Sequence, residues 1–137
     1  MILVLGADDA LLEGLAQALA ASGHSVAVAR TLEDVEELAG REPPLLLVAD
    51  CARLTLSEST KLARIATSAG SAVVAYRGHE EGPATLAFPA ELARITLADL
   101  ELPLERNRLV ALALYVAARA REVGRMPRTR SPRMPEL

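Results

Sequence analysis

The sequence predicts an α/β domain in which a parallel sheet carries helices on both faces. Short apolar runs alternate along the chain with longer segments whose apolar residues recur at helical spacing. Strands and helices that alternate in this way form parallel sheets with right-handed crossovers. The composition agrees, because 51% of the 137 residues are hydrophobic but only 2% are aromatic, which leaves Leu, Val, Ile and Ala to build the core.

Two strands and one helix open the chain. Ile2 to Leu5 is the first strand, and Gly6 breaks it. The first helix runs from about Ala10 to Ala21 and stops at Ser22-Gly23, because glycine accepts the left-handed conformation of a helix C-cap. Val26 to Ala29 is the second strand.

The second helix begins at Thr31, whose hydroxyl can cap a first turn rich in acidic residues. The run Leu45 to Ala49 follows without polar alternation, which predicts a third strand buried on both faces. Asp50 stands at the end of this strand. Ligands of open α/β sheets bind just past the carboxyl ends of the strands, so Asp50 is the first candidate site residue.

The second half of the chain predicts a helix that ends at Gly70, a fourth strand from Ala72 to Tyr76 and a less regular stretch from Arg77 to Leu100. Glycines and prolines interrupt that stretch, so we expect only a short or irregular helix within it. A fifth strand should lie within Ile95 to Leu102, and the last helix runs from about Leu104 to Val123.

The last helix is apolar on two faces, with Leu109, Leu112 and Val116 on one and Val110, Leu114 and Ala117 on the other. A surface helix of a small domain needs only one apolar stripe. The second stripe predicts a surface for self-association or for docking of a partner, and a homodimer through this helix is one form of it. Deep packing of the helix against the sheet explains the pattern equally well.

Charge divides the chain into a body and a tail. The net charge is −3, but residues 124–137 hold four Arg and one Glu and carry +3, so the remaining residues carry −6. We expect one domain over residues 1–122 and a flexible, basic, proline-containing tail over residues 123–137. The acidic body argues against nucleic acid as the main ligand.

The sequence predicts a cytoplasmic protein without membrane contacts. No apolar stretch is long enough to span a bilayer, and the first residues lack a basic leader. The single cysteine, Cys51, leaves no partner for an internal disulfide and fits a reducing compartment.

A family resemblance is carried by four segments in order: ILVLG with LLEGLAQAL, GHSVAVARTLEDVEEL, PPLLLVAD, and the ELP before the last helix. In this order and at this spacing, residues 1–122 resemble a response-regulator receiver domain of the CheY-like type. The resemblance implies a flavodoxin-like fold of three layers, with five parallel strands in the order 2-1-3-4-5. It also implies two-component signalling, in which a kinase passes a phosphoryl group from a histidine to an aspartate at the end of the third strand.

By position that aspartate is Asp50, the candidate phosphoacceptor. In receiver domains the acceptor and an acidic pair after the first strand hold Mg²⁺, which offsets the charge of the phosphate. Here the acidic pair falls on Gly6 and Ala7, and the carboxylates of Asp8 and Asp9 come later in the chain. Either of these can cap the first helix instead. A Mg²⁺ site among Asp8, Asp9 and Asp50 requires Asp8 or Asp9 to bend back toward the acceptor.

Two further positions depart from the receiver pattern. Tyr76 stands where a Thr or Ser normally binds the phosphoryl oxygens, and Leu102 stands where a Lys precedes the proline. The loop after Asp50 lacks the usual Met-Pro-Gly turn, and Arg77 could supply the missing positive charge. The resemblance therefore implies a pseudo-receiver, a stand-alone signalling domain with a degenerate pocket that acts through protein-protein contacts.

Its expected partners are a histidine kinase or a downstream effector, and no enzymatic activity is expected beyond phosphorylation of Asp50 from that kinase or a small phosphodonor. One alternative is an interaction module that works without phosphorylation. Another is a Rossmann-like NAD(P)-binding protein, because the opening strand-helix-strand pattern is similar and Arg30 could meet the 2′-phosphate of NADP. However, Asp9 and Leu12 replace glycines that the phosphate-binding turn of such a protein needs.

Overall fold

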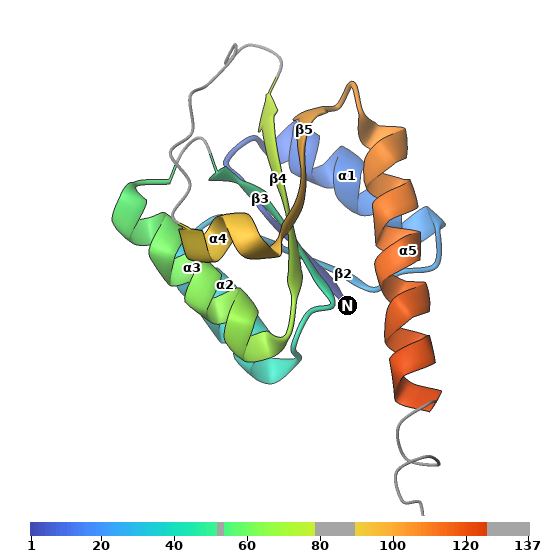
Figure 1. The fold of residues 1–137 in the computed structure, drawn as a ribbon. Coiled ribbons are helices and arrows are strands. Elements are labelled where there is room, and N and C mark those ends of the chain that lie inside the picture. Colours follow the sequence, from blue (N-terminus) through green and yellow to red (C-terminus); the bar gives the residue numbers. More distant parts are fainter. Residues whose placement is uncertain (52–53, 79–89, 126–137) are drawn as a thin grey trace, which may run out of the picture.

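Strands and helices alternate along the chain in the computed structural model, which describes residues 1–51, 54–78 and 90–125 (Figure 1). The strands are β1 (Ile2–Leu5), β2 (Val26–Ala29), β3 (Leu46–Asp50), β4 (Ala72–Gly78) and β5 (Thr96–Leu102). The helices are α1 (Asp9–Ala21), α2 (Leu32–Arg41), α3 (Leu56–Ala69), α4 (Ala90–Ile95) and α5 (Arg106–Arg125). The predicted alternation is confirmed, including a short fourth helix. Two strand ends were placed too early, because β3 includes Asp50 and β4 continues past Tyr76.

All five strands form one parallel sheet in the order β2-β1-β3-β4-β5. This order confirms the flavodoxin-like receiver fold. In a Rossmann dinucleotide-binding domain the third strand lies beside the second. Here β3 pairs with β1 instead, with Leu46 opposite Ile2. The order of the strands therefore does not support the Rossmann-like interpretation.

Helices cover both faces of the sheet, as a parallel sheet requires. The helices α1 and α5 lie on one face, and α2, α3 and α4 lie on the other (Figure 1). Successive residues of a strand point to opposite faces. On β3, Val48 belongs to the core beneath α1 and α5, whereas Leu47 and Ala49 belong to the core beneath α2 and α3. Burial on both faces explains why this strand shows no polar alternation.

The helix ends follow capping residues that are visible in the sequence. Asp8 is the N-cap of α1, and the predicted cap Thr31 is the N-cap of α2. The predicted stop after α1 is confirmed, because Gly23 has a φ of 95°. Gly70 ends α3 in the same left-handed region, where a residue without a Cβ is not penalised.

Only part of the apolar surface of α5 is buried. Leu109 and Ala113 pack beneath the helix in the core. Leu114 and Tyr115 remain 48% and 56% exposed. Packing therefore accounts for most of both predicted stripes, because Val110 of the second stripe also packs against this core and Ala117 is half-buried, and only Leu114 of the second stripe is exposed.

The helix α5 continues to Arg125, beyond the predicted domain end at residue 122. The rest of the predicted tail lies outside the described residues. No helix in the described part of the chain is long and apolar enough to cross a membrane.

Candidate functional site

The strand ends bring the candidate site residues to one edge of the sheet. β1 and β3 end side by side, because Leu5 pairs with Ala49. One residue further, Asp50 pairs with Tyr76 on β4. By strand alternation Asp50 and Tyr76 follow Val48 and Val74 on the side of the sheet that α1 and α5 cover.

Asp50 is 7% exposed and lines a pocket of about 420 Å³. The pocket lies among the ends of β1, β2 and β3 and the first turns of α2 and α3. The charged residues that line it are Arg30, Glu33, Asp50, Glu58 and Lys61. Carboxylates outnumber cations in this set, and like charges repel, so the pocket is poorly suited to a phosphate group.

Tyr76 fills the space at the end of β1. Its side chain is 1% exposed, and its hydroxyl donates a hydrogen bond of 3.1 Å to the carbonyl oxygen of Leu5. A Cβ built on Gly6 would lie only 2.1 Å from this hydroxyl oxygen. The Tyr76 hydroxyl therefore takes the space in which the acidic side chain of the receiver pattern would begin, and only glycine fits beside it.

The carboxylates of Asp8 and Asp9 serve the start of α1. Asp8 accepts a hydrogen bond of 3.2 Å from the backbone N–H of Leu11, which confirms the capping alternative for this residue. Asp9 forms an ion pair of 2.6 Å with Arg30. Among the residues that the structure describes, no three His, Cys, Asp or Glu side chains gather in a way that could hold a metal ion.

The predicted Mg²⁺ set of Asp8, Asp9 and Asp50 is thus not brought together. An octahedral Mg²⁺ needs oxygen ligands at close to ideal positions. Gly6 and Ala7 offer no side-chain oxygen, and the Tyr76 hydroxyl takes the space beside Gly6. The residues present do not fit Mg²⁺.

The lysine position of the receiver pattern is not replaced by a neighbouring cation. Leu102 is fully buried and belongs to the core with Leu109 and Ala113. Arg77, which could have replaced the missing lysine, forms an ion pair of 3.2 Å with Asp99 on β5. The Arg77 guanidinium is therefore held on the β5 side of β4, whereas Asp50 lies on β3 at the other side.

Sequence reasoning missed two features of this edge. It assigned Arg30 only to a nucleotide phosphate, whereas the structure pairs its guanidinium with Asp9. It also gave Lys61 no part in the site, although Lys61 lines the same pocket as Asp50. Neither feature has a local signal, because each one depends on the packing of segments that are distant in the sequence.

Cys51 follows Asp50 and is expected to be inert to alkylation in the folded protein. Its thiol is 2% exposed, and burial, reinforced by the charge of Asp50, raises its pKa from 9.0 to about 12. Iodoacetamide attacks the thiolate. We expect mass spectrometry to show no alkylation in mildly alkaline buffer and full alkylation in urea, and rapid alkylation of the folded protein would contradict the burial.

The same shift predicts a pH dependence of stability. Above the ordinary thiol pKa of 9.0 the unfolded chain loses a proton that the folded chain keeps. Stability should therefore fall as the pH rises above this value. Cys51→Ala should remove this part of the pH dependence in urea unfolding.

Comparison with known proteins gives matches among solved structures only. No protein-family model matches the chain, and no curated protein matches it. The structure of NtrX from Brucella abortus in complex with ADP matches with a TM-score of 0.73 and 24% identity. That match covers 99% of this chain but 30% of the NtrX chain.

Two isolated receiver domains match over nearly their whole length. A response regulator receiver domain protein from Clostridium thermocellum has a TM-score of 0.68 and 19% identity, with 89% of this chain and 97% of that chain covered. The receiver domain of NtrX from Brucella abortus has a TM-score of 0.64 and 19% identity, with 85% and 97% covered. At these identities the likeness concerns the fold.

Proposed function

We propose that this chain, which has the fold of response-regulator receiver domains, is a two-component signalling domain that works through protein contacts without a phosphoryl switch. The observation that carries the proposal is Tyr76, whose buried hydroxyl occupies the place of an acidic residue beside Gly6. A side chain fixed in this way leaves no room for the metal ligand that the receiver reaction needs.

The chemistry around Asp50 supports the same conclusion. Phosphorylation of an aspartate brings two anionic groups together, and a metal ion or cationic side chains must offset their repulsion. Gly6 and Ala7 supply no metal ligand, and the lysine position is taken by the buried Leu102. The two cations of the pocket are each paired with a carboxylate. Asp50 occupies the position of the phosphoacceptor, but its surroundings do not favour transfer of a phosphoryl group to it.

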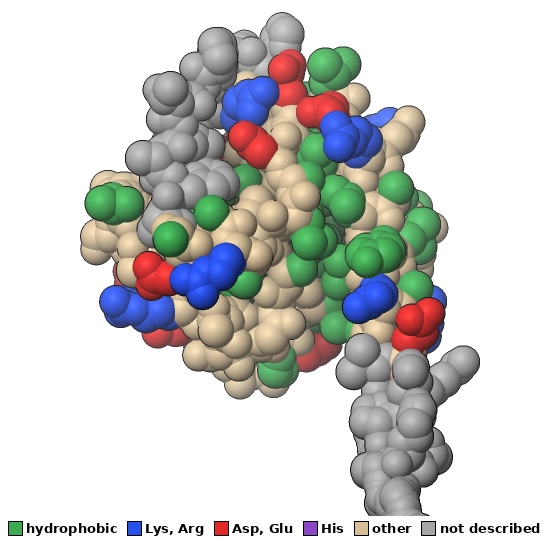
Figure 2. Space-filling view, in the orientation of Figure 1, with side chains coloured by type: hydrophobic (Ala, Val, Ile, Leu, Met, Phe, Trp, Pro, Cys, Tyr) green, Lys and Arg blue, Asp and Glu red, His purple; other side chains and the backbone are tan. Residues whose placement is uncertain are grey.

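The exposed part of α5 is the surface that we propose for a protein partner. Figure 2 shows hydrophobic side chains gathered over α5 and beside β5. Leu114 and Tyr115 on α5 are exposed, and so is Leu104 in the turn that precedes the helix. Exposed apolar clusters of this kind mark protein interaction sites. A histidine kinase or a downstream effector is the proposed partner, and a second copy on the same helix is the alternative.

Treatment with acetyl phosphate or beryllofluoride in the presence of Mg²⁺ tests the absence of a phosphoryl switch. We expect no increase in intact mass with acetyl phosphate and no change in the amide NMR spectrum with beryllofluoride. A receiver domain with all its site residues, treated in parallel, shows that the reagents work. Labelling that disappears in the Asp50→Asn variant would overturn the proposal and restore Asp50 as a working acceptor.

A further inference from the structure

We propose that the element which binds α5 is an amphipathic helix of another protein, with acidic side chains beside its apolar ones. This inference rests on the proposed function, which assigns the exposed part of α5 to a protein partner, and it names the chemistry of that partner. The inferred partner is therefore not a second copy of this chain.

The exposed apolar residues of α5 have the spacing of a helix-binding surface. They stand at positions i, i+3, i+4 and i+7 of the helix and are Ala111, Leu114, Tyr115 and Ala118. Residues at this spacing lie next to one another along one side of a helix. We call these four residues the apolar face of α5. A partner helix that presents apolar side chains at the same spacing can lie along such a face.

The apolar face is large at its centre and small at its ends. Leu114 and Tyr115 are 48% and 56% exposed and form the centre. Ala111 lies one turn before them and Ala118 one turn after them. Small residues let the backbone of a second helix come close, and the large side chains between them supply apolar area for it to bury. This shape favours a helix as the bound element.

The end of the apolar face nearest the C-terminus is basic. Arg119 and Arg121 are exposed and form no ion pair with any residue that the structure describes. Arg108, near the start of α5, is by contrast paired with Glu105 at 2.8 Å. Guanidinium groups without a carboxylate partner favour a ligand that supplies one. The bound helix should therefore carry acidic side chains level with the last turns of α5.

A second copy does not meet this requirement. Residues 105–122 hold four Arg and two Glu, so this segment carries +2. Two copies that met through α5 would place +2 against +2, and like charges across an interface suppress association. An acidic helix is attracted by the same charges. This difference in charge is the reason for choosing an acidic partner over a homodimer.

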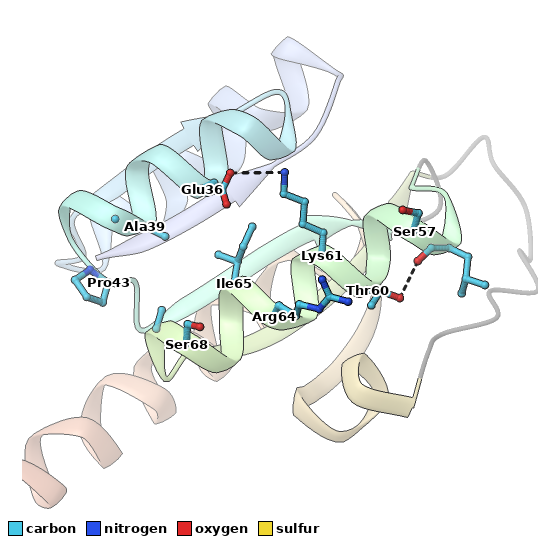
Figure 3. A pocket seen from close by; sticks show the side chains of 12 residues that line it. Glu36, Ala39, Pro43, Ser57, Thr60, Lys61, Arg64, Ile65 and Ser68 are labelled. Carbon is cyan, nitrogen blue, oxygen red and sulfur yellow. Dashed lines mark hydrogen bonds and ion pairs between the residues drawn. The ribbon is translucent and has the colours of Figure 1, made fainter.

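The groove between α2 and α3 offers a surface for comparison (Figure 3). It has a volume of about 830 Å³, and Glu36 and Lys61 face each other across it with 3.6 Å between their charged atoms. Leu56 is 65% exposed at this groove, and Arg64 is exposed without an ion pair among the described residues. Leu56 and Arg64 therefore provide matched controls, with the side-chain types of the α5 surface on a different part of the molecule.

Fluorescence anisotropy of the full chain with two labelled synthetic peptides tests the proposal. Both peptides form helices with Leu at positions i, i+3, i+4 and i+7, and one has Glu at the flanking positions where the other has Lys. We expect the Glu peptide to bind roughly tenfold or more tightly than the Lys peptide, because only its charges complement Arg119 and Arg121. Added salt should reduce this preference by screening the charges.

Variants of the chain show whether the peptide binds at α5. Leu114→Ala should weaken binding of the Glu peptide roughly tenfold through lost apolar burial. The double variant Arg119→Glu, Arg121→Glu should reverse the preference, so that the Lys peptide binds more tightly. Leu56→Ala and Arg64→Glu on α3 are the matched controls and should leave the preference and the affinity unchanged.

The proposal is overturned if the Glu peptide does not bind, if both peptides bind equally, or if the α5 variants bind like the wild type. A dimer of the wild type in sedimentation velocity that Leu114→Ala abolishes would assign α5 to a second copy instead. Binding of phosphatidylglycerol vesicles through Leu114, without binding of the Glu peptide, would assign α5 to an anionic membrane.

Failure of this inference and failure of the proposed function are distinguishable. A wild type that prefers the Lys peptide at α5 would overturn the acidic partner but keep α5 as a surface for a protein partner. Labelling of Asp50 by acetyl phosphate would overturn the absence of a phosphoryl switch and leave the binding of the Glu peptide intact.

Discussion

The Gly6→Ala variant is expected to lower the free energy of unfolding by about 1–3 kcal/mol, although it adds only a methyl group. The new Cβ would lie 2.1 Å from the Tyr76 hydroxyl oxygen and 3.1 Å from Leu12 Cδ2. The hydroxyl cannot move away cheaply, because it is hydrogen-bonded to Leu5 and the ring is buried. Urea unfolding followed by circular dichroism measures the loss.

Two further variants show whether the hydroxyl is the cause. Gly14→Ala in α1 is the matched control, because no atom lies within 4 Å of its Cβ, and it should stabilise the protein by about 0.5–1 kcal/mol. In a Tyr76→Phe background the hydroxyl is gone, so Gly6→Ala should cost less, with a coupling of about 0.5–3 kcal/mol. An equal cost in both backgrounds would show that the hydroxyl does not fill this place.

This contact has a consequence for the chemistry of the site. An aspartate at position 6 would carry its Cβ into the same hydroxyl, so an acidic ligand cannot be restored there by a single substitution. Gly6 and Tyr76 form a matched pair, and a receiver-like pocket requires both to change. The absence of an acidic residue at position 6 and the presence of Tyr76 are therefore two parts of one structural arrangement.

Most of the fold could be predicted because its signals are local. The apolar run of β3, the capping hydroxyl of Thr31 and the glycine after α1 each act within a few residues of their own position. The order of the strands is not local and was implied by the family resemblance. The end of β4 was missed because its last residues, Arg77 and Gly78, look like the start of a loop.

The site could be predicted only as a set of departures from a pattern. The sequence shows that Gly6, Tyr76 and Leu102 differ from the receiver residues, but it does not show where their side chains lie. The hydrogen bond between Tyr76 and Leu5 joins residues 71 positions apart. The pairing of Asp9 with Arg30 depends on how α1 meets the end of β2. Asp8 was correctly foreseen as a possible cap because an N-cap bonds within its own first turn.

Leu47→Ala is expected to destabilise the domain by about 2–5 kcal/mol. Leu47 is fully buried in β3, the middle strand of the sheet, where it pairs with Leu3 on β1 and Val73 on β4. Neighbouring strands hold it on both sides, so the cavity cannot close by a small shift of the backbone. A domain of this size is stable by about 5–15 kcal/mol in total, so the variant loses a large part of it. Urea and thermal unfolding measure the effect.

Leu56→Ala is the control for this prediction, because it removes the same atoms from a side chain that is 65% exposed. Its effect on stability should stay within about 0.5 kcal/mol. A similar cost for both variants would contradict the two-sided burial of β3.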